Sequence, residues 1–262
     1  MTLTKPLTAF SLLIASVFLS EKPASAQTVR NEAKYETTKS ISTDEVKTLE
    51  ANIGMGAGTL TINAGTGPLF NSRFRYSREA WKPQIAYSKE AGRGKLSVKQ
   101  PEGRNTNMDN NERNDWELTF NRNIPTNLKL RLGAGEGNVN LGGARLENLE
   151  LEAGAGEFTL NLANTSIPKL KVNAGVGELT LNLAGNRTSS LEADINGGIG
   201  DVTLKLPRKT GVRVKVGGLG SIDADGFRKE GGYYVNDAYG KTPVSIDIKV
   251  GGGLGSINLE LE

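Results

Sequence analysis

The chain has neither cysteine nor histidine among its 262 residues. Without cysteine it forms no disulfide, offers no thiol nucleophile and cannot carry a lipid on a new N-terminal cysteine. Without histidine it lacks the commonest general base and the commonest metal ligand, together with every catalytic triad that uses one. These two absences exclude many familiar classes of catalytic site, and we expect no cofactor.

Excess charge and long apolar runs are also scarce. The 32 Lys and Arg residues nearly balance 29 Asp and Glu residues, and the signs are interleaved, so the sequence predicts no nucleic-acid surface. The longest apolar run, residues 7–19, is too short to span a membrane comfortably. It follows Lys5 and precedes Ala24-Ser25-Ala26, which is the pattern of a secretory signal peptide. We predict that residues 1–26 export the protein to the periplasm, cell surface or medium, without a transmembrane segment.

Glycine, by contrast, is abundant, and many of the 33 glycines belong to a unit that recurs at a constant spacing. Units begin at Leu128, Leu149 and Leu170, with further copies at Leu191 and Val212. In each unit apolar and polar residues alternate, a Gly-x-Gly corner follows, and the alternation resumes. The alternation indicates half-buried strands, and glycine permits the sharp corner between them. Such a repeat indicates units that stack on one another and share one elongated core.

The polar residues of the repeat indicate how the units stack. Moving from Lys129 to the same position of each following unit leads through residues of alternating sign: Glu150, Lys171, Glu192 and Arg213. Parallel strands about 4.8 Å apart would place these opposite charges side by side. We therefore predict an all-β fold, a parallel β-solenoid made of a single-stranded, β-helix-like stack of Gly-x-Gly repeats. An antiparallel β-sandwich is the alternative, because it also contains short alternating strands at even spacing.

The chain divides unevenly around this repeat. Residues 27–127 form an irregular, aromatic-rich N-terminal cap with one repeat-like unit at 51–62, and this cap continues into a repeat region at 128–262. The final unit, 244–262, ends on the last residue, so we expect its strands to be uncovered. Uncovered strands expose unpaired backbone groups, which predicts weak homo-association or partner docking through this C-terminal coil.

Two groups of residues are candidate sites. The position after the Gly-x-Gly corner is acidic in four consecutive units: Glu136, Glu157, Glu178 and Asp201. Stacking would align these carboxylates, either as an edge that binds Ca²⁺ or Mg²⁺ or as caps for the free amides of their own glycine turns. The second group is aromatic and comprises Tyr76, Trp81, Tyr87 and Trp116. These rings either form a ligand-stacking platform for sugars or plug the open end of the stack.

Several motifs resemble those of a known family. The segments Trp81-Lys82-Pro83, Trp116-Glu117-Leu118 and Gly198-Ile199-Gly200-Asp201-Val202 resemble the toast-rack family. The segments Gly218-Leu219-Gly220 and Gly253-Leu254-Gly255-Ser256-Ile257 are similar to the LiaF-like domain of the cell-wall-active antibiotic response. This resemblance implies an all-β, non-catalytic protein of the cell envelope that is adhesin-like or associated with envelope stress.

The sequence thus predicts a non-enzymatic binding or scaffold protein whose partner is an envelope component or another protein. The alternative is a polysaccharide-active β-helix enzyme. Such an enzyme needs acidic residues clustered on one concave face, whereas the acidic residues here fall in charge-balanced rows or at corners.

Overall fold

The computed structural model describes residues 33–101, 108–109 and 111–262; the predicted signal peptide, 1–26, lies outside these residues. Within them the chain forms fifteen strands and one short 3₁₀ turn, η1 (Glu79–Trp81). None of the described helical segments is long and apolar enough to cross a membrane. The predicted all-β class is therefore confirmed.

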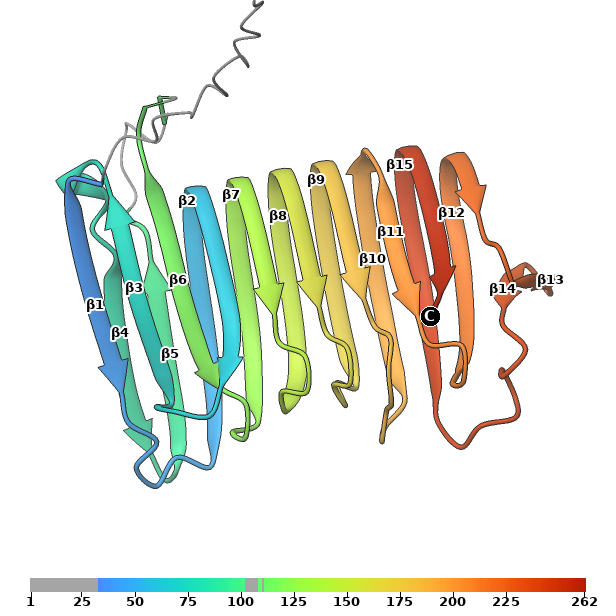
Figure 1. Ribbon diagram of the computed structural model, residues 1–262, viewed down its shortest axis with the longest axis horizontal. Coiled ribbons are helices and arrows are strands. Elements are labelled where there is room, and N and C mark those ends of the chain that lie inside the picture. The colour runs from blue at the N-terminus through green and yellow to red at the C-terminus, as the bar shows by residue number, and fades with distance from the viewer. Residues whose placement is uncertain (1–32, 102–107, 110) are drawn as a thin grey trace, which may run out of the picture. The chain divides into compact units, whose positions relative to one another are not determined.

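The centre of the fold is a row of long, bent strands (Figure 1). β2 (Thr48–Gly65), β7 (Thr126–Asn140), β8 (Leu146–Asn161) and β9 (Lys169–Asn182) pair in parallel with one another along both arms of each bend. Leu128, Leu149 and Leu170 lie directly opposite one another, so the step between these strands is one sequence repeat, as expected. Parallel pairing at this step is confirmed for these units, and the antiparallel alternative is wrong for them.

Each bent strand contributes a first arm before the glycine corner and a second arm after it, so the row forms two sheets that face each other across the core. In β7 the first-arm residues Leu128, Leu130 and Leu132 are at most 2% exposed. Burying one leucine side chain stabilises a fold by about 1.5–3 kcal/mol, and this contribution recurs in every coil. Outside the core, Asn161 donates a hydrogen bond to Asn140 at 3.0 Å, so like side chains also stack on the surface.

At the N-terminal end of the row, each arm of β2 continues in parallel into one further strand, to which antiparallel strands are added. The first arm of β2 pairs with β5 (Arg93–Lys99), which pairs with β4 (Gln84–Glu90). The second arm pairs with β6 (Asn114–Asn121), followed by β3 (Phe70–Tyr76) and β1 (Tyr35–Ile41). Residues of the aromatic-rich segment fill the core here, with Phe74 and Trp116 packed edge to face at 5.2 Å between ring centroids.

The C-terminal end departs from the predicted order of units. Following β9 come β10 (Leu191–Ile199) and β11 (Val202–Leu206), which together make one coil. The next coil in space is β15 (Ser245–Leu261), the last strand of the chain, and β12 (Gly211–Asp223) lies beyond it. β15 is therefore paired on both sides, and the prediction of an uncovered final unit is wrong. The outermost coil is β12.

The step between coils also changes along the row. Between β9 and β10 the step is longer than one sequence repeat, because the return segment 183–190 is longer than those before it, and Glu192 lies opposite Lys169 instead of Lys171. Lys171 lies opposite Asp194. The predicted pair of Lys171 with Glu192 is wrong, yet opposite charges still face each other after the shift.

Candidate functional site

The four predicted acidic residues lie in one row, each at the start of a second arm. Glu136 is opposite Glu157, which is opposite Glu178, and all four carboxylates are exposed. Asp201 accepts hydrogen bonds from the backbone N–H and the hydroxyl group of Ser256 on the adjacent strand β15, which lower the pKa of Asp201. Across the described residues, no group of three or more acidic side chains is arranged to hold a metal ion. Cation binding by this row stays a prediction.

The four predicted aromatic residues do not form an exposed platform. Trp116 is fully buried, and Tyr76 and Trp81 are 3% exposed, because they pack in the core of the N-terminal end. Trp116 donates its indole N–H to Asn114 at 2.9 Å, and the Tyr76 hydroxyl group lies 2.9 Å from that of Thr37. Tyr87 alone is half-exposed. The stacking hypothesis is wrong for the three buried rings, which cannot receive a ligand on a face.

A broad polar groove crosses the outer face of the first arms in the C-terminal half of the row. Two lines of in-register residues run across it. One line is Lys169, Glu192, Asp247 and Arg213, and the other is Lys171, Asp194, Lys249 and Lys215. All but the last of these residues line the groove, together with Asn148, Leu170 and Ala193.

One ion pair of the groove is held by contacts between neighbouring strands. Arg213 on β12 binds the carboxylate of Asp247 on β15, with Nε 2.9 Å from Oδ1, and this hydrogen bond raises the pKa of Arg213. The guanidinium group also lies 4.8 Å from the ring centre of Tyr233 and 5.5 Å from that of Tyr239. Such cation–π contacts hold the arginine in place at the end of the groove. Sequence analysis missed this groove because its lines depend on the position of β15.

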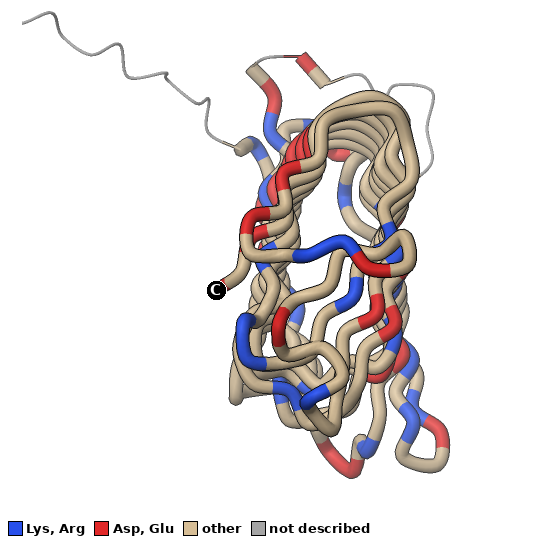
Figure 2. The backbone as a smooth tube through the Cα atoms, turned by 90° about the vertical axis from the view of Figure 1, so that its right-hand side faces the viewer, with Lys and Arg blue, Asp and Glu red and all other residues tan. Residues whose placement is uncertain are grey.

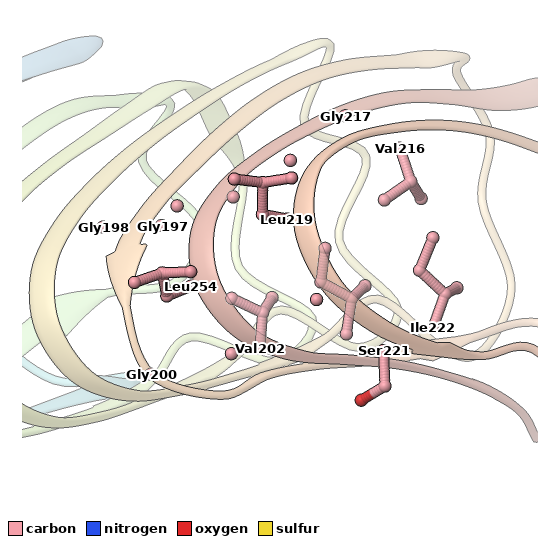
Figure 3. A pocket seen from close by; sticks show the side chains of 16 residues that line it. Gly197, Gly198, Gly200, Val202, Val216, Gly217, Leu219, Ser221, Ile222 and Leu254 are labelled. Carbon is pink, nitrogen blue, oxygen red and sulfur yellow. The ribbon is translucent and has the colours of Figure 1, made fainter.

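A second surface of note lies at the glycine corners of the last coils (Figure 3). The residue between the two corner glycines is alanine in β2, β7 and β8, but it becomes a larger aliphatic residue in the coils that follow in space. In order these residues are Val176, Ile199, Leu254 and Leu219, and they are 54, 55, 58 and 75% exposed. The signal was present in the sequence as the middle residue of each Gly-x-Gly motif.

The position that follows the Gly-x-Gly corner is also uncharged in the last coils. The acidic row that starts at Glu136 ends at Asp201, and the next positions in space are Ser256 and Ser221. Charge therefore disappears from the corner where the aliphatic side chains are largest. We call the exposed set Ile199, Leu219, Ile222 and Leu254 the apolar corner.

The comparisons with known proteins agree with this architecture. The model of the N-terminal domain of toast_rack matches residues 29–166 and 148–205. A crystal structure of a "putative cell adhesion protein" from Clostridium sporogenes is 32% identical, covers 87% of this chain and 99% of its own, and superimposes with a TM-score of 0.68. A "putative adhesin" from Bacteroides fragilis is 12% identical over 87% of this chain and 99% of its own, with a TM-score of 0.31. No curated protein matches the chain.

Proposed function

The chain belongs to the toast-rack family, and from this premise we propose that it is a non-enzymatic binding or scaffold protein that acts at the cell envelope. The observation that carries the proposal is the polar groove on the first arms. Its lining includes four cationic and three anionic side chains, so it is close to neutral although densely charged. Such a surface suits a polar or zwitterionic envelope polymer, a glycan or a peptide, better than a nucleic acid, which selects for excess positive charge.

The groove offers a poor arrangement for the alternative function, polysaccharide cleavage. Glu192 lies opposite Lys169, Asp194 lies opposite Lys171, and Asp247 is bound by Arg213. Glycoside hydrolysis needs two carboxyl groups that both reach the substrate, and Asp247 is already engaged by Arg213. The relative from Clostridium sporogenes is likewise named for adhesion and not for catalysis.

Architecture and export complete the proposal. We infer that the two-sheet row is the predicted β-solenoid, with one coil per bent strand and the N-terminal sheets as its cap. Residues 1–26 direct the chain out of the cytoplasm, so the groove would face envelope material. A fixed, repetitive surface can bind a repetitive polymer at several points at once, which raises the overall affinity. Multivalent binding of this kind is the physical basis for an adhesin-like role.

The test is co-sedimentation of the purified protein with insoluble envelope material, together with capture from a soluble envelope extract. We expect binding that Lys249→Glu weakens at least about fivefold, because Lys249 is an exposed cation on the second line of the groove. Lys241→Glu makes the same charge change at an exposed lysine outside the groove and should bind like the native chain.

Equal binding by the native chain and Lys249→Glu would reject the groove as the binding surface. A cleavage assay on envelope polysaccharides separates the two functions. Release of sugar fragments by the native protein would overturn the non-enzymatic role, whatever the outcome of the binding experiment.

A further inference from the structure

The outermost coil is open on only part of its outer side. β14 (Tyr233–Val235) pairs with β12 at Arg213 and Val214, and β13 (Arg228–Glu230) pairs with β14. Ala224, Phe227 and Tyr234 are partly buried against the core, so this segment covers the end of the stack away from the glycine corner. Figure 2 shows it crossing the end of the stack below the bend.

The second arm of β12, after the bend, has no strand on its outer side among the described residues. The outer edge of β12 from its glycine corner, Gly218-Leu219-Gly220, to Asp223 therefore presents unpaired backbone groups at the apolar corner. Ile222 is 40% exposed there, although Ile257, directly opposite on β15, is only 7% exposed. The core of the last coil is thus incompletely covered at this place.

The other free edges of the sheets are protected by charge. β1 carries exposed Glu36 and Lys39, and β4 carries exposed Lys89 and Glu90. Charged residues on edge strands prevent unwanted pairing with other chains. The segment Gly218–Ile222, in contrast, contains no charged residue. The one charged residue of this edge, Asp223, stands at its end, so the five residues before it lack the usual protection.

We propose that the outer edge of β12 at its glycine corner, residues Gly218–Ile222, pairs, antiparallel, with the same edge of a second copy of this chain, around a two-fold axis at Gly220. Residues whose numbers sum to 440 then lie opposite each other, so Leu219 faces Ser221 of the second copy and Ile222 covers Gly218. No charged residue opposes another within this segment. The pairing is isologous, because the same five residues serve both copies.

A lipid surface fits this site less well than a strand. The apolar corner alone could enter a bilayer, but the unpaired backbone groups of β12 would then lose their hydrogen bonds to water without replacement. A second copy supplies both the backbone partners and the apolar contact. The paired segment is short, and interfaces well below about 1,200 Å² are weak and transient, so we expect a reversible dimer at high concentration.

The experiment is sedimentation equilibrium of the full exported chain over a wide concentration range. We expect association that Leu219→Lys weakens at least about tenfold in dissociation constant. The matched control is Val176→Lys, which makes the same kind of change at the same corner position, in a coil paired on both sides. Both side chains are mostly exposed, so both variants should fold. Circular dichroism and melting temperature check this directly.

A strictly monomeric native chain would overturn the proposal. Loss of association in both variants would also overturn it, because the contact would then lie on the whole apolar row and not on the edge of β12. Addition of neutral lipid vesicles tests the remaining occupant: native binding to vesicles without self-association would assign the corner to a membrane.

Cross-linking tests the register independently. Because the native chain has no cysteine, only the introduced cysteines can form a disulfide. A mixture of Leu219→Cys and Ser221→Cys chains should form a mixed disulfide faster than either variant forms its own. A mixture of Val176→Cys with Ser221→Cys is the control for random collision. Equal yields from the two mixtures would reject the proposed pairing. Failure of these experiments would leave the groove function untouched, since the groove lies on the first arms.

Discussion

At the glycine corners successive coils lie too close together for an added Cβ, and this predicts the outcome of single alanine substitutions. At Gly156 an added Cβ would lie 1.8 Å from the carbonyl oxygen of Gly135 in the previous coil, and φ is +141°. At Gly154 the corresponding distance, to the oxygen of Gly133, is 2.1 Å, but φ lies outside the left-handed region. Gly156→Ala therefore introduces both a steric clash and an unfavourable backbone conformation, whereas Gly154→Ala introduces the steric clash alone.

Two glycines elsewhere complete the design. Gly143 has a φ of +69° with nothing within 4 Å of an added Cβ, so Gly143→Ala introduces only an unfavourable backbone conformation. Gly67 has open space and no positive φ, so Gly67→Ala introduces neither a clash nor backbone strain. The four variants remove one glycine each and separate the two physical effects.

The magnitudes follow from general values. A non-glycine residue in a left-handed conformation costs roughly 1–2 kcal/mol, and overpacking costs roughly 1–3 kcal/mol. Alanine also restricts the unfolded chain, which stabilises the fold by about 0.4–1 kcal/mol. We expect the free energy of unfolding to rise by up to about 1 kcal/mol in Gly67→Ala and to fall by about 1 kcal/mol in Gly143→Ala. The loss should be about 1–2 kcal/mol for Gly154→Ala and about 2–4 for Gly156→Ala.

The assay is urea unfolding followed by circular dichroism, with the shift of the midpoint compared among the four variants. The order of midpoints should be Gly67→Ala, then Gly143→Ala, then Gly154→Ala, then Gly156→Ala. If Gly154→Ala were as stable as Gly67→Ala, successive coils would not approach each other as closely as the structure places them.

Further predictions concern charge, burial, metal and chain order. Lys171→Glu faces the carboxylate of Asp194 and should lower stability by about 1 kcal/mol at low salt and by less at high salt, as measured by urea unfolding. Arg187 is buried, and burial lowers its pKa to about 10, so Arg187→Met should be at least as stable as the native chain at pH 7. Above pH 10 the folded arginine loses its proton before the unfolded one does, so the free energy of unfolding of the native chain should rise relative to that of this variant. Millimolar Ca²⁺ should leave the melting temperature unchanged, whereas a rise that Glu157→Gln abolishes would establish a cation site in the acidic row. Deletion of 245–262 should unfold β12 as well, which loss of protection from hydrogen exchange in β12 would show, because β15 separates that strand from the rest of the row.

Much of the fold was predictable because the constant spacing of the repeat determines which residues of neighbouring strands pair. Leu149 and Leu170 fall opposite each other by counting residues, and the period-two pattern identifies which side chains face inward. The first charged pair followed from the same count: Lys129 lies 2.8 Å from Glu150, and hydrogen bonds to Glu150 and Glu152 raise the pKa of Lys129. The count failed for Lys171 with Glu192 and for Glu192 with Arg213, which lie beyond the change of step. Burial of Trp116 was not predictable in this way, because the aromatic segment lies outside the repeat and gives no register.

The position of β15 could not be predicted, because the charge pattern fits a wrong order equally well. If β12 paired directly with β10, Arg213 would face Glu192, another favourable pair; in the observed order Arg213 binds Asp247. The observed order even places Lys215 opposite Lys249, so surface charge did not select it.

Buried hydrogen bonds instead hold the observed order in place. Asn236, only 1% exposed, donates to the carbonyl oxygen of Thr210 at 2.8 Å and accepts the N–H of Val212 at 2.9 Å. These bonds tie the segment after β14, which leads on to β15, to the start of β12 and the connection before it. A buried amide satisfied by backbone groups is costly to break, since its partners would lose their hydrogen bonds away from water. β15 lies between β11 and β12, and the uncharged segment Gly218–Ile222 is left on the free edge of the outermost strand, where another chain can reach it.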